Sequence, residues 1–128
     1  NIDILIPNEY ELERMSKVII KDKESIIEAA KILLNKGIKM IIVTLGSKGV
    51  FYMDHGKHRF FEAYKVDVVD TTAAGDSFIG GFVSSYLENK DIIKAIDMGQ
   101  KSAAITIQRV GAQSSLPTKS EIEALKIS

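Results

Sequence analysis

The sequence has no cysteine and no tryptophan, only two prolines, and no excess of one charge, since 17 basic residues balance 17 acidic ones. Without cysteine the chain can form neither disulfide bonds nor thiolate metal sites, which fits the reducing cytoplasm. A balanced charge gives no electrostatic reason to expect nucleic acid as a partner. No apolar run approaches the ~18 residues of a membrane-spanning helix and no signal peptide is evident, so the sequence predicts no membrane partner.

The remaining composition and pattern are those of an α/β domain. The 128 residues are 45% hydrophobic, which is enough for one compact core. Short β-branched runs alternate with amphipathic runs, and this predicts helices that cover a mainly parallel sheet, with a β-hairpin as a local antiparallel addition. The predicted strands cover residues 2–6, 39–44, 50–53, 58–61 and 66–69, and the predicted helices cover 8–18, 23–35, 76–89, 92–108 and a final stretch after 118.

The predicted helices carry caps and apolar stripes. Asp22 and Asp91 stand directly before two of the helices, where a carboxylate commonly accepts a hydrogen bond from the first turn. Apolar residues at helical spacing predict the buried faces. These residues are Leu12 and Met15 in the first helix, Ile26, Ala29, Ala30, Leu33 and Leu34 in the second, and Ile92, Ile93, Ile96, Ala103, Ala104 and Ile107 in the helix after Asp91.

The most informative stretch is DTTAAGDSF, residues 70–78, between an extended run and an apolar helical run. Its alanines and its glycine let the backbone approach a ligand, and the first turn of a helix leaves about four N–H groups without partners. Together with the positive end of the helix dipole, this favours phosphate. Asp76 has two interpretations from spacing alone, a helix N-cap or a general base for a hydroxyl that attacks phosphate.

Three further features have competing interpretations. Asn8 and Glu11 are three residues apart, which is the spacing of a capping box. Residues 44–49 follow a predicted strand, where ligand-binding loops of α/β sheets lie, although the glycines there could serve only to form a turn. His55 and His58 flank a predicted turn with no acidic pair beside them, so both are predicted to be surface residues rather than metal ligands.

Two adjacent glycines, Gly80 and Gly81, lie inside a predicted helix, where each costs about 1 kcal/mol relative to alanine. Something is therefore expected to approach this helix closely. Tight packing of the helix on the sheet is the favoured explanation, and contact with a ligand is the alternative. No Lys-Ser or Lys-Thr pair follows Gly75 and Gly80, so the stretch is not a P-loop.

Four segments in the same order resemble the ribokinase-like (PfkB-type) family of carbohydrate kinases, and the resemblance covers nearly the whole chain. They are PNEYE at 7–11, TLGSKGV at 44–50, DTTAAGDSF at 70–78 and RVGAQSSLP at 109–117. The resemblance implies the C-terminal, nucleotide-binding and catalytic part of a three-layer ribokinase-like fold. Because the sequence starts at Asn1, almost directly in a strand, we expect it to lack the family's N-terminal half, with most sugar contacts and a lid.

The resemblance also implies the chemistry, which is transfer of the ATP γ-phosphoryl group to a sugar hydroxyl, with ribose as the expected acceptor and ribose 5-phosphate as the product. Asp76 would be the general base, in contact with the sugar, and the backbone amides of Ala73, Ala74, Gly75 and Asp76 would form an anion hole. Family members often have histidine where this sequence has Gln100, so the adenine contact is left open. The nucleotide-binding positions that the resemblance implies are Asn8, Thr44, Leu45, Gly46, Ser47, Lys48, Gly49, Gly75 and Gln100.

Two metal ions follow from the same resemblance. Mg²⁺ would arrive with the ATP phosphates and keep several waters, with Asn8 and Glu11 as outer-shell neighbours. K⁺ would activate the enzyme by ordering residues 70–76, since a large monovalent cation suits carbonyl oxygens. The implied potassium ligands are the side chains of Asp70 and Ser115 and the carbonyl groups of Thr72, Thr106, Arg109 and Gly111.

Two alternatives to a ribose kinase remain open. The acceptor could be fructose, a nucleoside or another small alcohol, because most sugar contacts would lie in the missing half. The chain could also serve only as a nucleotide-binding or assembly module. We expect this chain by itself to be inactive or nearly so. The full-length protein could form a homodimer through the family's lid, which these residues do not include.

Overall fold

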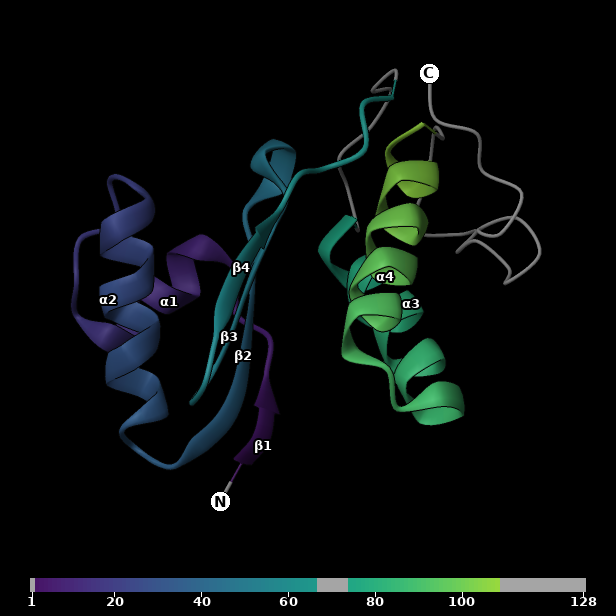
Figure 1. Ribbon diagram of the computed structural model, residues 1–128. Helices are drawn as coiled ribbons and strands as arrows, with labels where there is room; N and C mark the ends of the chain where they lie inside the picture. Colours follow the sequence, from purple (N-terminus) through teal and green to yellow (C-terminus); the bar gives the residue numbers. More distant parts are fainter. Residues whose placement is uncertain (1, 67–73, 109–128) are drawn as a thin grey trace. The chain divides into compact units, whose positions relative to one another are not determined.

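The computed structural model describes residues 2–66 and 74–108. It divides into two compact units, Asn1–Glu62 and Ala63–Ser128, and each is described here by itself. The first unit is a sheet with two helices, and the described part of the second is a helix pair with the segment that precedes it (Figure 1). No helix in the described ranges is long and apolar enough to span a membrane.

The first unit contains a mixed four-stranded sheet in the order β1-β2-β3-β4. Its strands are β1 (Ile2–Leu5), β2 (Ile38–Thr44), β3 (Val50–Asp54) and β4 (His58–Phe61). β1 and β2 are parallel, whereas β2–β3 and β3–β4 are antiparallel. The predicted hairpin is thus confirmed. The described sheet is mixed rather than mainly parallel, because the hairpin supplies both antiparallel pairings and residues 67–69 of the last expected strand lie outside the described residues.

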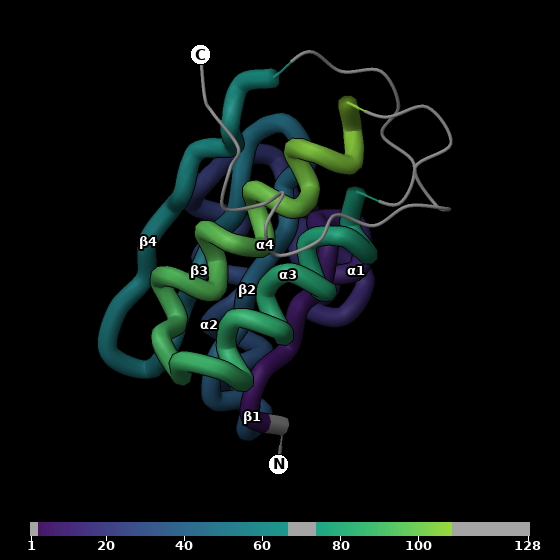
Figure 2. The backbone as a smooth tube through the Cα atoms, turned by 90° about the vertical axis from the view of Figure 1, so that its right-hand side faces the viewer, coloured from purple at the N-terminus to yellow at the C-terminus, as the bar shows by residue number. Residues whose placement is uncertain are grey.

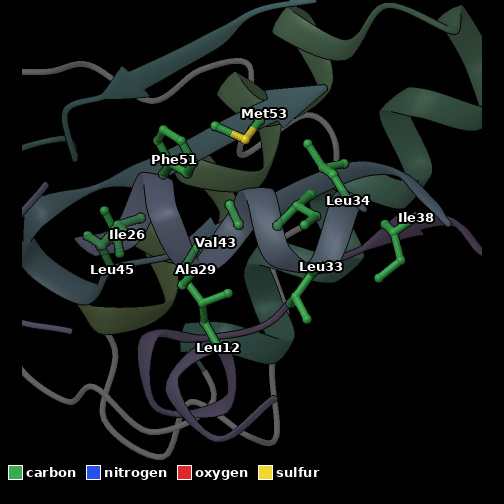
Figure 3. Packing of buried hydrophobic residues seen from close by; sticks show 12 residues of the cluster. Leu12, Ile26, Ala29, Leu33, Leu34, Ile38, Val43, Leu45, Phe51 and Met53 are labelled. Carbon is green, nitrogen blue, oxygen red and sulfur yellow. The ribbon is translucent and has the colours of Figure 1, made fainter. Parts of the chain in front are cut away.

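Helices α1 (Glu9–Ser16) and α2 (Lys23–Leu34) cover one face of this sheet (Figure 1). All five apolar residues predicted to form the buried face of α2 are buried, and they pack against β2 and β3 (Figure 3). In α1, Leu12 is fully buried but Met15 is 40% exposed. The prediction for Met15 is wrong because this short helix buries the line through Leu12 and Ser16, and Met15 lies beside that line.

The predicted caps of α2 and of α4 (Ile92–Ile107) are confirmed. Asp22 accepts a hydrogen bond from the Ser25 amide at 2.8 Å, and Asp91 accepts one from the Lys94 amide at 3.1 Å. Hydrogen bonds from the Ser25 amide and then from its side chain hold the pKa of Asp22 below its ordinary value, since they stabilise the charged carboxylate. These caps fix where both helices begin.

The turn between β3 and β4 is organised by Asp54. Its carboxylate accepts hydrogen bonds from the Gly56 and Lys57 amides, both at 2.8 Å, and from the Tyr52 hydroxyl at 2.6 Å. Burial acts to raise the pKa of Asp54, but these hydrogen bonds outweigh it and the pKa lies below its ordinary value.

His55 and His58 are exposed, and no group of metal-ligating side chains occurs in the described part of the chain. The prediction that they are surface residues is confirmed.

The second unit contains α3 (Ala74–Asn89) and α4, which lie side by side (Figures 1 and 2). The helices touch at backbone distance. A Cβ atom at Gly81 would lie 2.8 Å from the Met98 carbonyl oxygen, and one at Gly99 would lie 2.8 Å from the Phe78 ring. Close packing is therefore confirmed at Gly81, where the described partner is α4. At Gly80, a Cβ would meet no described atom within 4 Å.

The buried face of α4 differs from the predicted one. Ile96 and Ala104 are buried as expected, but Ile93 is 40% exposed. Ile92, Ala103 and Ile107 are half-buried. The prediction is wrong at Ile93 because α3 approaches α4 through Gly99 and Ser102, and the buried side of α4 is centred on these small residues.

The adjacent glycines of α3 make a matched stability test. Gly81→Ala is expected to lower the free energy of unfolding by about 1–3 kcal/mol, because its methyl group would be forced against the backbone of α4. Gly80→Ala is expected to raise it by up to about 1 kcal/mol, since alanine favours helix and the space is open. Urea or thermal unfolding measures both. Equal effects of the two substitutions would contradict the described helix contact.

Candidate active site

The first group of candidate residues lies at the carboxyl ends of β1 and β2. Asn8 and Thr44 form an isolated parallel bridge, and the Thr44 amide donates to the Pro7 carbonyl at 3.0 Å. The parallel pairing of β1 and β2 thereby brings the start of α1 next to the start of the loop 44–49. Two segments separated by about a quarter of the chain thus meet at one sheet edge, where ligand-binding loops of α/β proteins lie.

Asn8 and Glu11 form the predicted capping box. The Glu11 amide donates to Asn8 Oδ1 at 2.7 Å, and the Asn8 amide donates to Glu11 Oε1 at 2.9 Å. Both residues are exposed. Each side chain uses one polar atom for the cap, and the second one, Asn8 Nδ2 or Glu11 Oε2, has no hydrogen-bond partner among the described residues. The cap is therefore compatible with a further role toward a ligand.

The loop after β2 is a short 3₁₀ turn, η1 (Gly46–Lys48). Gly46 and Gly49 have φ angles of 60° and 107°, which favour glycine, so turn formation alone accounts for both glycines. Leu45 is buried and its amide donates to the Gly49 carbonyl at 2.8 Å. Leu45 thus anchors the loop with its side chain and its N–H group. The exposed residues that remain available to a nucleotide are Gly46, Ser47 and Lys48.

The second group lies in the first turn of α3. This helix begins at Ala74, so Asp76 is inside the first turn and the interpretation of Asp76 as the N-cap is wrong. The helical acceptors of the Ala74, Gly75 and Asp76 amides would be carbonyl groups of residues 70–72, which lie outside the described residues. Gly75 and Asp76 are exposed. The Asp76 carboxylate therefore lies beside the Ala74 and Gly75 backbone on an accessible turn.

The remaining candidates are on α4 or outside the described residues. Gln100 is half-buried on α4, and Thr106 is fully buried in its last turn. The carbonyl group of Thr106 lies at the negative end of the helix, where cations are favoured. Outside the described residues lie Asp70, Thr72, Ala73, Arg109, Gly111 and Ser115.

A cluster of three buried hydroxyl groups joins α3 to α4, and the sequence analysis missed it. Ser77, Ser102 and Thr106 are 1%, 3% and 0% exposed. Thr106 Oγ1 donates to Ser77 Oγ at 2.6 Å, and the Ser77 and Ser102 hydroxyl oxygens are 2.7 Å apart. The only signal in the sequence is the spacing of four between Ser102 and Thr106, which puts both on one side of the helix.

The segment before the undescribed residues 67–73 is fastened to the same helix. The Tyr64 hydroxyl donates to the Asp97 carboxylate, which also pairs with Lys101 at 3.2 Å. Burial, together with the hydrogen bond to the Asp97 carboxylate, raises the pKa of Tyr64 well above its usual value and keeps the hydroxyl protonated as a donor. The chain that leads into the DTTAAGDSF stretch is thus held against α4 at Tyr64.

Comparison with known proteins identifies the family. A model of the pfkB family carbohydrate kinases matches residues 1–119. The chain belongs to this family. It is 48% identical to the ribokinase of Haemophilus influenzae, over 94% of this chain and 39% of that protein. These matches confirm the family that the four sequence segments resemble.

Solved structures extend the match to the fold. An Arabidopsis thaliana ribokinase complexed with ribose and ATP gives a TM-score of 0.89 at 32% identity, over 94% of this chain and 39% of that one. An E. coli protein described as a ribokinase II, in complex with ATP and Mg²⁺, gives 0.80 at 30% identity, over 94% and 38%. The ribokinase-like α/β fold is confirmed. The chain spans about two fifths of the length of these pfkB-family relatives.

The two interpretations of Glu11 can be separated by Glu11→Gln. The amide oxygen of glutamine can still accept the bond from the Asn8 amide, so the cost in unfolding free energy is expected to stay within about 1 kcal/mol, the usual worth of a first-turn charge. An outer-shell role toward magnesium predicts an activity or Mg²⁺ affinity lower by about 10- to 100-fold. Both are measured in a chain of full family length.

Glu24 provides the matched control, because it is also an acidic residue in the first turn of a helix, α2. Glu24→Gln is expected to have the same small effect on stability and none on the Mg²⁺ dependence. If Glu11→Gln behaves like Glu24→Gln in both measurements, Glu11 serves the cap alone.

Proposed function

We propose that the full-length protein containing this chain transfers the γ-phosphoryl group of ATP to a sugar hydroxyl, with ribose as the first candidate acceptor. The observation that carries the proposal is the first turn of α3, where the exposed Asp76 carboxylate lies beside the backbone of Ala74 and Gly75 at the positive end of the helix. Family membership supports the same chemistry, and so do relatives named ribokinase, one of them complexed with ribose and ATP.

Asp76 is the proposed general base. The sugar hydroxyl oxygen attacks the γ-phosphorus, the bond from that phosphorus to the bridging oxygen breaks, and ADP leaves. The hydroxyl proton passes to the Asp76 carboxylate. Since a carboxylate is a weak base toward an alcohol, the proton moves as the new oxygen–phosphorus bond forms. Its exposed position in the described chain leaves the carboxylate open to a sugar.

The amides of Ala73, Ala74, Gly75 and Asp76 are the proposed anion hole. Charge that develops on the phosphoryl oxygens is stabilised by N–H groups that are already oriented, because the helix fixes them before the reaction. The dipole of α3 acts in the same direction, since its positive end is at this turn. Ala73 lies outside the described residues, and the other three begin α3.

For the nucleotide we propose the edge formed by Asn8 and the loop 44–49, together with Gly75 and Gln100. The exposed backbone of Gly46 and Ser47 and the Lys48 ammonium suit a polyphosphate, and the free Asn8 Nδ2 adds a donor beside them. Magnesium would bind chiefly through the ATP phosphates, with Asn8 and Glu11 next to its waters. ATP and Mg²⁺ are both present in the E. coli relative.

Potassium is the proposed activating ion. The donor chemistry fits at Thr106, whose carbonyl group is in the last turn of α4, where the helix dipole favours cations. When bound, the ion would supply positive charge beside the anion hole. The other proposed ligands are the side chains of Asp70 and Ser115 and the carbonyls of Thr72, Arg109 and Gly111, all outside the described residues.

The first test is Asp76→Asn in a chain of full family length, assayed with ATP and a panel of ribose, fructose, fructose 6-phosphate and a nucleoside. Loss of the base is expected to lower the rate by about 10²- to 10⁴-fold, while ATP still binds. Ribose is expected to be the preferred acceptor, and potassium is expected to give a faster reaction than sodium. Two results would overturn the proposal. One is full activity of Asp76→Asn, and the other is a wild-type protein that binds ATP but phosphorylates none of the acceptors.

Gly75→Ala tests the anion hole without changing any functional side chain. A Cβ at this position would meet no described atom within 4 Å, so the fold is expected to be as stable or slightly more stable. Turnover is nevertheless expected to fall by about 10-fold or more, because the methyl group would keep the phosphoryl oxygens from the amides. Gly80→Ala, later in the same helix, is the control. Unchanged turnover of Gly75→Ala would argue against a ligand at this turn.

A further inference from the structure

The hydroxyl cluster of Ser77, Ser102 and Thr106 is a closed hydrogen-bond network. The Ser77 hydroxyl donates to the Ser102 carbonyl at 3.0 Å, and Thr106 Oγ1 donates to Ser77 Oγ at 2.6 Å. With the Ser102 hydroxyl donating its own proton at 2.7 Å, Ser77 Oγ makes one donation and accepts two bonds, which is its full capacity. Three buried polar groups thus have every hydroxyl proton paired.

The network connects the two ends of the helix pair that matter for the proposed chemistry. Ser77 directly follows Asp76 in the first turn of α3, and Thr106 is in the last turn of α4. Other close approaches between these helices occur at Gly81, next to the α4 backbone, and at Gly99, next to the Phe78 ring. Van der Waals contacts at glycine are non-directional, whereas hydrogen bonds define both distance and angle. The cluster therefore adds directional bonds to the packing that positions the first turn of α3.

Another buried serine of α3 has no such role. Ser85 is 7% exposed, and its hydroxyl has no hydrogen-bond partner among the described residues. A serine can thus be buried in this helix without joining a network. Ser77 differs from it by the partners that α4 presents, and Ser85 is consequently a matched control for removal of a buried hydroxyl.

We propose that Ser77, Ser102 and Thr106 are positioning residues for the reaction, which rests on the function proposed above. By fixing the first turn of α3 to the last turn of α4, they hold the Asp76 carboxylate and the neighbouring amides in the geometry that phosphoryl transfer requires.

The test uses Thr106→Val, which keeps the shape of the side chain but removes the hydroxyl, Thr106→Ser, which keeps the hydroxyl, and Ser77→Ala. In a chain of full family length, Thr106→Val and Ser77→Ala are expected to lower kcat by about 10- to 100-fold, as expected for a displaced catalytic group. KM for ATP and for the sugar is expected to stay near the wild-type value. Thr106→Ser is expected to recover most of the kcat that Thr106→Val loses, and Ser85→Ala is expected to keep kcat.

Amide hydrogen exchange over residues 78–81, whose N–H groups donate to the carbonyl groups of residues 74–77 in the first turn of α3, provides a readout that does not depend on activity. Exchange is expected to be faster in Ser77→Ala and Thr106→Val than in Thr106→Ser and Ser85→Ala, because the first turn opens more often without its anchor.

Two results would overturn the positioning role. In the first, Ser77→Ala and Thr106→Val both have the kcat and the amide exchange rates of the wild type. In the second, Ser85→Ala loses as much kcat as these two variants. Failure of the proposed function would give other results, because the wild type would then transfer no phosphoryl group or Asp76→Asn would be fully active. In that case the exchange comparison would still show whether the cluster holds the first turn of α3.

Discussion

The close contact between α3 and α4 is the constraint on which the proposed catalytic end of this chain depends. At Gly81 and Gly99 the absence of a side chain lets one helix reach the other at backbone distance. That approach brings the Ser77 hydroxyl within 2.6 Å of Thr106 Oγ1, a distance that a larger residue at either glycine would not allow. Two glycines without any chemistry of their own thereby set the position of the turn that carries Asp76.

In the first unit, strand pairing and a buried side chain hold the candidate residues in place. Parallel pairing of β1 and β2 puts the N-cap of α1 beside the loop 44–49, and the buried Leu45 side chain anchors that loop in the core. Asn8 and Glu11 each use one polar atom for the cap, and the other polar atom of each side chain has no partner among the described residues. In both units the groups proposed to face a phosphate lie at helix ends, where backbone N–H groups and the helix dipole favour anions.

Local signals made much of this predictable from the sequence. The caps at Asp22 and Asp91, the apolar stripe of α2 and the hairpin around Asp54 depend on residues close in sequence, and each was found. The family followed from four short segments. The features that the sequence did not predict depend on contacts between residues far apart in the chain. The exposed Ile93 and the buried hydroxyl cluster both result from where α3 meets α4, and no periodicity within one helix carries that information.

Most of the proposed site consists of backbone groups, and this limits what a sequence can reveal about it. An amide in the first turn of α3 is present whatever side chain it bears, so residue identity points to only one chemical group there, the Asp76 carboxylate. The residues around the amides matter through geometry, as Gly75 does by leaving space and Ser77 by holding the turn. A change at such a position would alter the rate without altering any group that touches the substrate. The proposed site accordingly depends on residues one layer behind the groups proposed to face the phosphate, and the α3–α4 contact supplies these residues.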